Sequence, residues 1–375
     1  MEDGNLVTVA KDQTCGTLFY LSQKKSMTEY VPESLQENAV GRAILSSKVP
    51  FQRGVVYSRL KGIIGLLAIL LLALVASPHS ARGGLVFLEA GNITDILRQV
   101  SEIGIISLGM TFVILTGGID LSVGTVLALS SSLVTIVLTR VSFGWPQSVG
   151  ITAAAVTALI GGALVGFMNG AIIARWRIQP FIVTLATMIG IRGLARWLTS
   201  NANIDLGFGS DIASVFARAL STKTIVIGSY VLLAVALGAV LSKTVFGRYV
   251  RAVGDNEKAA EYAGLPIVKT KILVYTMTGL LAGYAGVLHA AQNHQGNPNT
   301  GVAYELEAIA AVVIGGTSLM GGSGSISGTV VGTLIIGILT NILRLNNIDS
   351  NLELIVKAII IIAAVWLQQK SKEST

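Results

Sequence analysis

The chain lacks the charge that a soluble globular protein needs at its surface. Only 13% of its 375 residues are charged, whereas a soluble domain carries about 25%. Hydrophobic residues make up 52% of the chain, and the mean hydropathy is +0.70. Because so few charges cannot cover a globule of this length, lipid must replace water over much of the surface. The composition predicts an all-α polytopic membrane protein.

Cysteine, histidine and nucleotide-binding motifs are also scarce. Cys15 is the only cysteine, which excludes a disulfide framework and a thiol-based metal cluster. The histidines His79, His289 and His294 have no metal-ligand spacing. There is no GxxxxGKS or GxxxxGKT phosphate loop. We therefore expect no catalytic residue, no metal and no cofactor in this chain. The N-terminus also lacks the apolar core of a cleavable signal peptide.

The net charge of +7 has two explanations. A basic protein can bind nucleic acid, but Lys and Arg also accumulate on the cytoplasmic loops of membrane proteins. The second explanation suits a chain this apolar. We therefore expect membrane lipid as a partner, and not nucleic acid.

Long apolar runs predict about ten transmembrane helices, because one crossing takes about 20 mostly apolar residues. The uncharged stretch between Glu307 and Arg344 is long enough for two crossings, with the glycine-rich 321–328 as the turn between them. Arg192 and Arg196 weaken one segment, 181–200. Single crossings are expected within 61–82, 102–120, 120–140, 150–174, 181–200, 224–242, 272–291 and 354–368.

The basic residues indicate the orientation. Of the 27 Lys and Arg residues, 18 lie in 1–61, 175–180, 243–271 and the residues after 368. These segments face the cytoplasm under the positive-inside rule, so we expect an N-in, C-in arrangement. The expected organisation is a cytoplasmic tail (1–58), a transmembrane domain (59–368) that includes the cytoplasmic loop 243–271, and a short cytoplasmic tail (369–375).

The stretch "VILTGGIDLSVG" places a carboxylate, Asp120, inside an apolar run. The small residues around it are Gly117, Gly118, Ser122 and Gly124. They predict a broken helix whose exposed backbone groups must line a cavity or be buried in protein. One interpretation is that Asp120 or Ser122 caps the next helix at a hinge. The other is a direct role for Asp120 in the transport path or its gate, because intramembrane carboxylates are usually functional or paired.

The loop 246–271 contains a second motif, "DNEKAAEYAG". Asp255 or Asn256 is a suitable N-cap for a short helix. Gly264 is a suitable terminator, with Pro266 just beyond it. A short amphipathic helix between two cytoplasmic helix ends, ringed by basic residues, is typical of a docking element. The alternative is a solvated loop that only follows the positive-inside pattern.

Polar residues in 166–200 offer amide and hydroxyl groups to a polar solute. Asn169 lies at the inner end of one expected helix. Thr184 and Thr187 lie in the first turns of the next helix, which Pro180 begins. These three are our candidate substrate-path residues. The alternative is that the threonines bond their own backbone or a neighbouring helix.

The pattern GG, five residues, GTV occurs at 117–126 and again at 321–330. It hints at an internal repeat with a broken helix pair in each half, an arrangement found around transporter sites. Glu305 and Glu307 precede the second copy. We expect both at the outer edge of a helix, where an interfacial position explains them.

These motifs together resemble the ribose-type sugar permeases of bacterial ABC importers, in the branched-chain amino acid/ribose permease superfamily. The similarity runs from about residue 92 to 368. Branched-chain amino acid members lack a motif like "GGIDLSVG", which favours a sugar. The matching stretches, in order, are "LGMTFVILTGGIDLSVGTVLALSS", "NGAIIARWRIQPFIVTLATMIGIRGLA", "RAVGDNEKAAEYAGLPI" and "ELEAIAAVVIGGTSLMGGSGSISGTVVGTLIIG".

The resemblance implies a permease subunit of the bacterial inner membrane that imports a monosaccharide by alternating access. It implies three protein partners: a second permease copy or close paralogue, a cytoplasmic tandem ATP-binding subunit that binds ATP-Mg, and an extracytoplasmic sugar-binding protein. The tail 1–58 is longer than this family leads us to expect. The implied coupling residues, which would transmit ATP hydrolysis, are Arg251, Gly254, Asn256, Glu257, Ala260 and Gly264.

Three rival functions stay open at this point. A stand-alone secondary transporter would use Asp120 as an ion or proton site. An ABC permease for a nucleoside, an amino acid or an autoinducer sugar would share the motifs, because specificity in such importers lies largely in the separate binding protein. A membrane enzyme would need a catalytic cluster, which the sequence does not show.

Overall fold

The structure is a computed structural model that describes residues 64–80, 83–142, 144–349, 351–360 and 362. The expected tails 1–58 and 369–375 lie outside these residues. The first described helix is Ile64–Val75, and residues 351–360 are helical. Between them the elements are η2 (Val86–Leu88), α4 (Ala90–Leu115), α5 (Val123–Ile136), η3 (Val137–Val141), α6 (Gln147–Trp176), α7 (Pro180–Thr199), β1 (Ile204–Asp205), α8 (Ile212–Leu220), α9 (Lys223–Lys243), α10 (Val245–Asp255), α11 (Glu257–Tyr262), α12 (Ile267–Asn293), β2 (Gln295–Gly296), α13 (Tyr304–Ile314) and α14 (Ile326–Leu345).

The expected all-α polytopic fold is confirmed. Within the described residues, seven helices are long and apolar enough to cross a membrane: α4, α5 with η3, α6, α7, α9, α12 and α14. The other three crossings expected from the sequence correspond to shorter helical segments. These are Ile64–Val75, α13 and residues 351–360.

Helix α12 packs along α6, α5 and α4, so the core of the bundle lies around it. Small residues make this close packing possible, as is usual between membrane helices. Gly162 and Gly166 of α6 face Gly279 and Gly283 of α12, and a Cβ on Gly166 would overlap the carbonyl oxygen of Tyr275. No larger side chain fits this seam, which accounts for part of the high glycine content.

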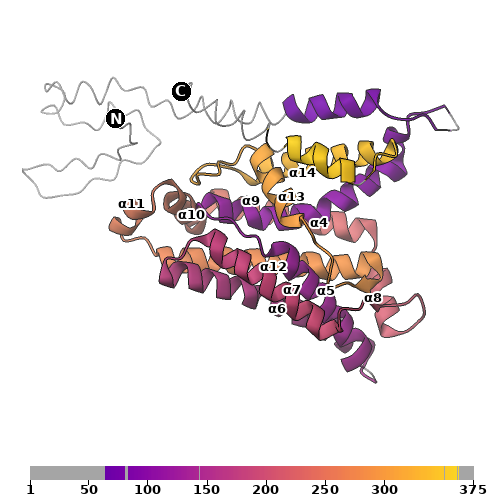
Figure 1. The fold of residues 1–375 in the computed structure, drawn as a ribbon, viewed down its shortest axis with the longest axis horizontal. Coiled ribbons are helices and arrows are strands. Elements are labelled where there is room, and N and C mark those ends of the chain that lie inside the picture. Colours follow the sequence, from indigo (N-terminus) through magenta and orange to yellow (C-terminus); the bar gives the residue numbers. More distant parts are fainter. Residues whose placement is uncertain (1–63, 81–82, 143, 350, 361, 363–375) are drawn as a thin grey trace, which may run out of the picture. The chain divides into compact units, whose positions relative to one another are not determined.

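The two ends of α12 define the two sides of the bundle. Helix α11 precedes its first turn (Figure 1), and strand β2 follows its last turn. Because α12 has 27 residues, these ends are about 40 Å apart. Under the positive-inside rule, we expect the end with α10 and α11 to face the cytoplasm. We call it the cytoplasmic end, and the other end the external end.

The external end carries the antiparallel pair β1–β2, in which Ile204 pairs with Gly296, and the short helix α8. Asp211 is the N-cap of α8 and accepts hydrogen bonds from the backbone N–H and the hydroxyl of Ser214. The hydroxyl contact in particular holds the pKa of the Asp211 carboxyl below its usual value. Local capping therefore fixes where α8 begins.

The segment between β2 and α13 contains irregular backbone that is held by arginines of α7. Arg192 donates hydrogen bonds to the carbonyl oxygens of Pro298 and Thr300. Arg196 donates to Asn299 Oδ1 over 2.8 Å. Arg192 thus satisfies backbone carbonyls of this irregular segment, a requirement wherever irregular backbone enters a membrane, and Arg196 holds one of its side chains.

Candidate functional site

The break between α4 and α5 is built around the carboxylate of Asp120, which is 1% exposed. Ser122 donates two hydrogen bonds to Asp120 Oδ1, from its backbone N–H over 2.9 Å and from its hydroxyl over 2.6 Å. This is an Asx-type turn. Ser122 is the N-cap residue of α5, but its side chain accepts no hydrogen bond from the helix. Asp120 therefore fixes the conformation of Ser122, the residue just before α5. The side chain of Ser122 does not cap that helix.

The glycines of the motif have separate structural reasons. Gly117 has a φ of +74°, which favours glycine. A Cβ on Gly118 would overlap the hydroxyl of Tyr275, and one on Gly124 would overlap the carbonyl oxygen of Gly301. The break is thus packed tightly against α12 on one side and against the segment before α13 on the other.

The hinge and substrate-path candidates meet in one buried network. Asn169 Nδ2 of α6 donates to the hydroxyl of Ser122 over 3.0 Å, and Thr187 of α7 donates to Asn169 Oδ1 over 2.6 Å. Thr184 donates to the carbonyl oxygen of Ile119 over 3.1 Å and to that of Pro180, in its own helix, over 3.0 Å. The side chains of the break, α6 and α7 therefore form a continuous polar chain.

This network fixes the start of α5 against α6 and α7. Asn169 and Thr184 are 0% exposed and Thr187 is 8% exposed. Neither of the two cavities described below is lined by them. Both threonines make the contacts of the alternative interpretation, because Thr184 bonds its own backbone at Pro180 and Thr187 bonds Asn169 of the neighbouring helix α6. Contact of these residues with a solute stays a prediction.

The second glycine-rich break, between α13 and α14, lies against the first. The backbone N–H of Gly322 donates to the carbonyl oxygen of Leu115, the last residue of α4, over 3.0 Å. Helix α14 begins at Ile326, with Ser325 as its N-cap. Thr111 of α4 and Thr329 of α14 share a buried hydrogen bond of 2.7 Å. The two copies of the GG–GTV pattern are therefore both helix breaks, and they contact each other.

The last turn of α10 packs against both breaks. A Cβ on Gly254 would overlap the carbonyl oxygen of Leu115, and it would lie 2.7 Å from the backbone nitrogen of Gly322. Gly254 thus allows direct backbone contact between α10 and the ends of two broken helices. This contact connects the cytoplasmic loop to the membrane-embedded part of the chain.

Helix α11 matches the short helix expected after Asn256, and its docking role stays a prediction. Asn256 is its N-cap and accepts from the backbone N–H of Ala259 over 2.9 Å. Gly264 has a φ of +75° just after the helix. Glu257 pairs with Lys271 over 2.8 Å. The ion pair ties this short helix to the first turns of α12.

Some of the residues expected to couple the chain to an ATPase are buried, and the others are exposed. Ala260 is buried, and Gly254 is covered on one side by the two breaks. Arg251, Asn256, Glu257 and Gly264 are exposed. Tyr262, which the sequence did not single out, is 90% exposed on the same helix. An exposed aromatic ring beside these polar groups gives α11 a surface suited to a protein partner.

Ionisable residues that the sequence did not select line a cavity of about 210 Å³ near the external end. His289 Nδ1 and Glu102 Oε1 are 2.6 Å apart, and His289 Nε2 lies 2.7 Å from the hydroxyl of Thr300. Glu102 and His289 lie within apolar runs of the sequence, where ionisable groups are usually functional or paired. This position could have identified them as candidate site residues. The lining residues are Arg98, Gln99, Glu102, His289, Gln292, Asn293, Tyr304 and Arg344.

Glu305 and Glu307 make different contacts within the chain. Both lie in the first turn of α13. Glu307 pairs with Lys357 over 2.5 Å, and the carboxylate of Glu305 lies beside Gly124. The two carboxylates therefore belong to packed contacts within the chain.

Comparison with known proteins identifies the family. Residues 92–365 match the family described as "Branched-chain amino acid transport system / permease component". The ribose import permease protein RbsC of Bacillus subtilis is 42% identical over 317 residues, which cover 84% of this chain and 94% of that protein. RbsC of Escherichia coli K12 is 39% identical over 318 residues, with 83% and 94% covered.

A relative named after another sugar also matches the chain. The L-arabinose ABC transporter permease protein AraH of Azospirillum brasilense is 38% identical over 296 residues, which cover 76% of this chain and 81% of AraH. No solved structure matches the chain. With its apolar helices, the chain belongs to the branched-chain amino acid/ribose permease family and is a multi-pass permease of the bacterial inner membrane.

Proposed function

We propose that this chain is the membrane-spanning subunit of a binding-protein-dependent ABC importer that moves a monosaccharide into the cytoplasm. ATP hydrolysis on a partner subunit drives transport, and a second copy of the permease or a close paralogue completes the pathway. The permeases that this chain resembles are named after ribose, L-arabinose, fructose and xylose import. The names of these relatives support a monosaccharide as the solute.

The contact of α10 with both helix breaks is the observation that carries the ATP-driven mechanism. Transport by alternating access requires a partner that binds two states of the permease with different affinity. A tandem ATP-binding subunit on the exposed face of α11 meets this requirement. Movement of α11 displaces α10, and the direct contacts of Gly254 with Leu115 and Gly322 pass this displacement to both breaks.

The rival function as a stand-alone secondary transporter has less support. It requires Asp120 to bind an ion or proton from a cavity. The Oδ1 atom of Asp120 already accepts two hydrogen bonds from Ser122, and Asp120 lines neither described cavity. Asp120 therefore resembles a hinge residue more than a transport site.

Reconstitution into proteoliposomes tests the proposed function. The chain is reconstituted with candidate ATP-binding and sugar-binding proteins from its source organism. Uptake is measured with radiolabelled D-ribose, L-arabinose, D-xylose and D-fructose. We expect uptake of at least one sugar that requires ATP on the ATPase side and stops without the ATP-binding subunit.

Uptake by the chain alone under a proton or sodium gradient would refute the proposal. An ATP-dependent uptake of a nucleoside, an amino acid or an autoinducer sugar, with none of these four, would replace the solute class.

A further inference from the structure

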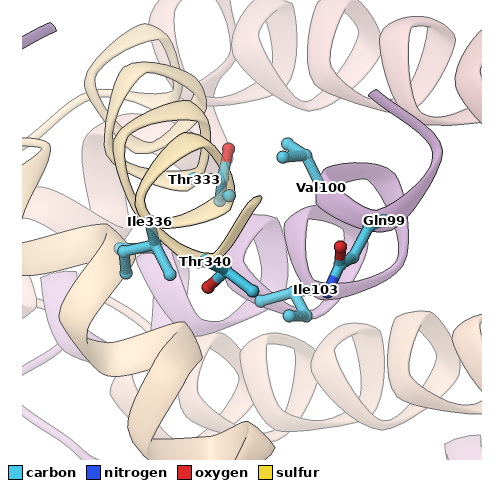
Figure 2. A pocket seen from close by; sticks show the side chains of 8 residues that line it. Gln99, Val100, Ile103, Thr333, Ile336 and Thr340 are labelled. Carbon is cyan, nitrogen blue, oxygen red and sulfur yellow. The ribbon is translucent and has the colours of Figure 1, made fainter. Parts of the chain in front are cut away.

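Two cavities within the described part of the chain differ greatly in size and chemistry. The one between α4 and α14 is about 10 Å³ and is lined mainly by aliphatic and threonine side chains (Figure 2). It has room for about one water molecule. The cavity near the external end is about 210 Å³, below the roughly 300–1,000 Å³ of pockets for drug-sized ligands. Only the second has the size for a small solute.

We propose that this larger cavity is the site at which the permease receives its sugar from the external side, and we call it the external cavity. This inference rests on the proposed function, because it assigns a place in the chain to the same monosaccharide. The residues that carry it are Arg98, Glu102, Gln292, Asn293 and Tyr304, which come from α4, α12 and α13.

The lining has the hydrogen-bonding groups that a sugar requires. Each sugar hydroxyl both donates and accepts, so a sugar site needs donors and acceptors side by side. Arg98 offers only donors, Glu102 in its ionised form only acceptors, and the amides of Gln292 and Asn293 offer both. The ring of Tyr304 adds an apolar surface with a polar tip. Every class of contact for a ring with several hydroxyls is therefore present.

The central acceptor of the external cavity is held in place before any ligand enters. Glu102 Oε1 contacts His289 Nδ1 over 2.6 Å, and Gln292 Nε2 donates to Glu102 Oε2 over 3.4 Å. Arg98 donates to Gln292 Oε1 over 3.1 Å. Groups that are fixed in this way lose less conformational freedom when a ligand binds.

The external cavity also keeps groups that the protein itself does not use fully. Arg98 Nε is buried and has no hydrogen-bond partner among the described residues, although it lies 3.7 Å from Asp95 Oδ1. A buried donor without a partner is costly, so a ligand that draws the Arg98 side chain into a new hydrogen bond would remove that cost. The long contact between Gln292 and Glu102 is likewise weak enough for a sugar hydroxyl to replace it.

The position of the external cavity agrees with delivery from outside. His289, Gln292 and Asn293 lie in the last two turns of α12, at the end farthest from α11. Gln99 lines both cavities, so the external cavity lies directly beside the seam of α4 and α14. Below it this seam is closed by Val100 against Gly337 and by the Thr111–Thr329 hydrogen bond.

The same lining disfavours an apolar amino acid side chain, the solute of the other branch of the family. A leucine or valine side chain in this cavity would leave buried polar groups without partners. Sites built to hydrogen-bond a solute reject analogues that lack those groups. The external cavity therefore favours a polyhydroxylated solute.

The test is direct binding to the full chain in lipid nanodiscs, by saturation-transfer difference NMR. The probe is whichever of the four sugars the reconstituted importer takes up, with L-leucine as the apolar comparison. We expect transfer to the sugar protons and none to L-leucine. Gln292→Leu removes an amide of the cavity, and Asn293→Leu changes an exposed lining residue that is easily replaced without unfolding.

A matched control makes the variants informative. Gln147→Leu is the same chemical change at an exposed residue of α6, outside the cavity. Loss of one hydrogen bond to an uncharged group is worth about 0.5–1.5 kcal/mol. We therefore expect roughly two- to thirteenfold weaker sugar binding for Gln292→Leu and for Asn293→Leu, with no change for Gln147→Leu. Equal binding by all three variants and the unchanged chain would overturn the inference.

The outcomes separate this inference from the proposed function. If the importer takes up a sugar with ATP but the full chain shows no saturation transfer to it, the cavity assignment is wrong and the function stands. If none of the four sugars is taken up and L-leucine receives the saturation transfer, both are wrong. Stronger transfer to D-ribose 5-phosphate than to the transported sugar would show an anion site and also overturn the assignment.

Discussion

The backbone N–H of Gly322 donates a 3.0 Å hydrogen bond to the carbonyl oxygen of Leu115. This bond joins the end of α4 to the break between α13 and α14, two segments far apart in the chain. Gly254 packs against both residues from α10. The two helix breaks and the loop 243–271 are thus in direct contact, and the predictions below examine whether they act as one unit.

Gly254→Ala should disrupt this unit. The added methyl group overlaps the carbonyl oxygen of Leu115, and relieving such an overlap costs about 1–3 kcal/mol. We expect a lower Tm for the purified permease and loss of ATP-driven uptake. The control is Gly190→Ala in α7, where a methyl group meets open space and the Tm should not fall. If Gly254→Ala behaved like Gly190→Ala in both measurements, the contact would have no mechanical role.

Asp120→Asn and Asp120→Ala separate a hinge from a charge-dependent gate. Asparagine keeps the oxygen that accepts the two hydrogen bonds from Ser122. Alanine leaves both buried donors unpaired, at a cost of about 1–3 kcal/mol. We expect near-normal uptake with asparagine and strong loss with alanine, measured as initial rates at equal protein level. Loss of uptake in both variants with an unchanged Tm would instead require the negative charge.

A double-mutant cycle on Asn169 and Thr187 measures the buried network. Their hydrogen bond is 2.6 Å long, and residues in one such network show interaction energies of about 0.5–3 kcal/mol. We expect Asn169→Ala and Thr187→Val each to lower the free energy of unfolding, with the double variant less destabilised than the sum. Additive effects within about 0.5 kcal/mol would show that the pair acts independently. A change in sugar selectivity without a change in stability would support the substrate-path role.

Variants of α11 examine coupling to the ATP-binding subunit. Glu257→Lys reverses the charge opposite Lys271, and Gly264→Pro replaces a residue with a φ of +75°, which proline cannot adopt. We expect both to retain membrane insertion but to uncouple ATP hydrolysis from uptake. The readout is the ratio of sugar imported to ATP hydrolysed. Normal ratios in both variants would count against the docking role.

Tyr262→Asp offers a milder change on the same helix. The ring is 90% exposed, so the substitution should leave the Tm of the isolated permease unchanged. We expect weaker co-purification of the ATP-binding subunit. Phe208→Asp is the control, because Phe208 is 79% exposed but lies near the external end. Equal co-purification of the two variants would place the ATP-binding subunit elsewhere.

Local features of the chain were sufficient to predict several elements. Apolar runs locate helices because crossing a bilayer requires a continuous apolar stretch. The break at 116–122 and the cap at Asn256 follow from neighbouring glycines and short polar side chains. The sequence does not predict helix α10, which precedes α11, because its mixture of arginines, glycines and apolar residues is also typical of a loop between apolar segments.

Contacts between distant segments were not predictable from such patterns. Asn169, Thr187 and Ser122 belong to three different segments, and nothing in their spacing shows that they bond to one another. The same holds for Glu102 and His289, which meet only because α4 and α12 run antiparallel and close together.

The sequence by itself determined that this chain is a helical membrane permease with two glycine-rich breaks and a short charged helix between its apolar segments. Only the tertiary structure decided that both breaks meet at Gly254 and that the polar residues of the external cavity surround one space. The physical reason is that hydropathy and capping act within a few residues of the chain. Helix packing, by contrast, depends on where small residues allow two distant backbones to approach.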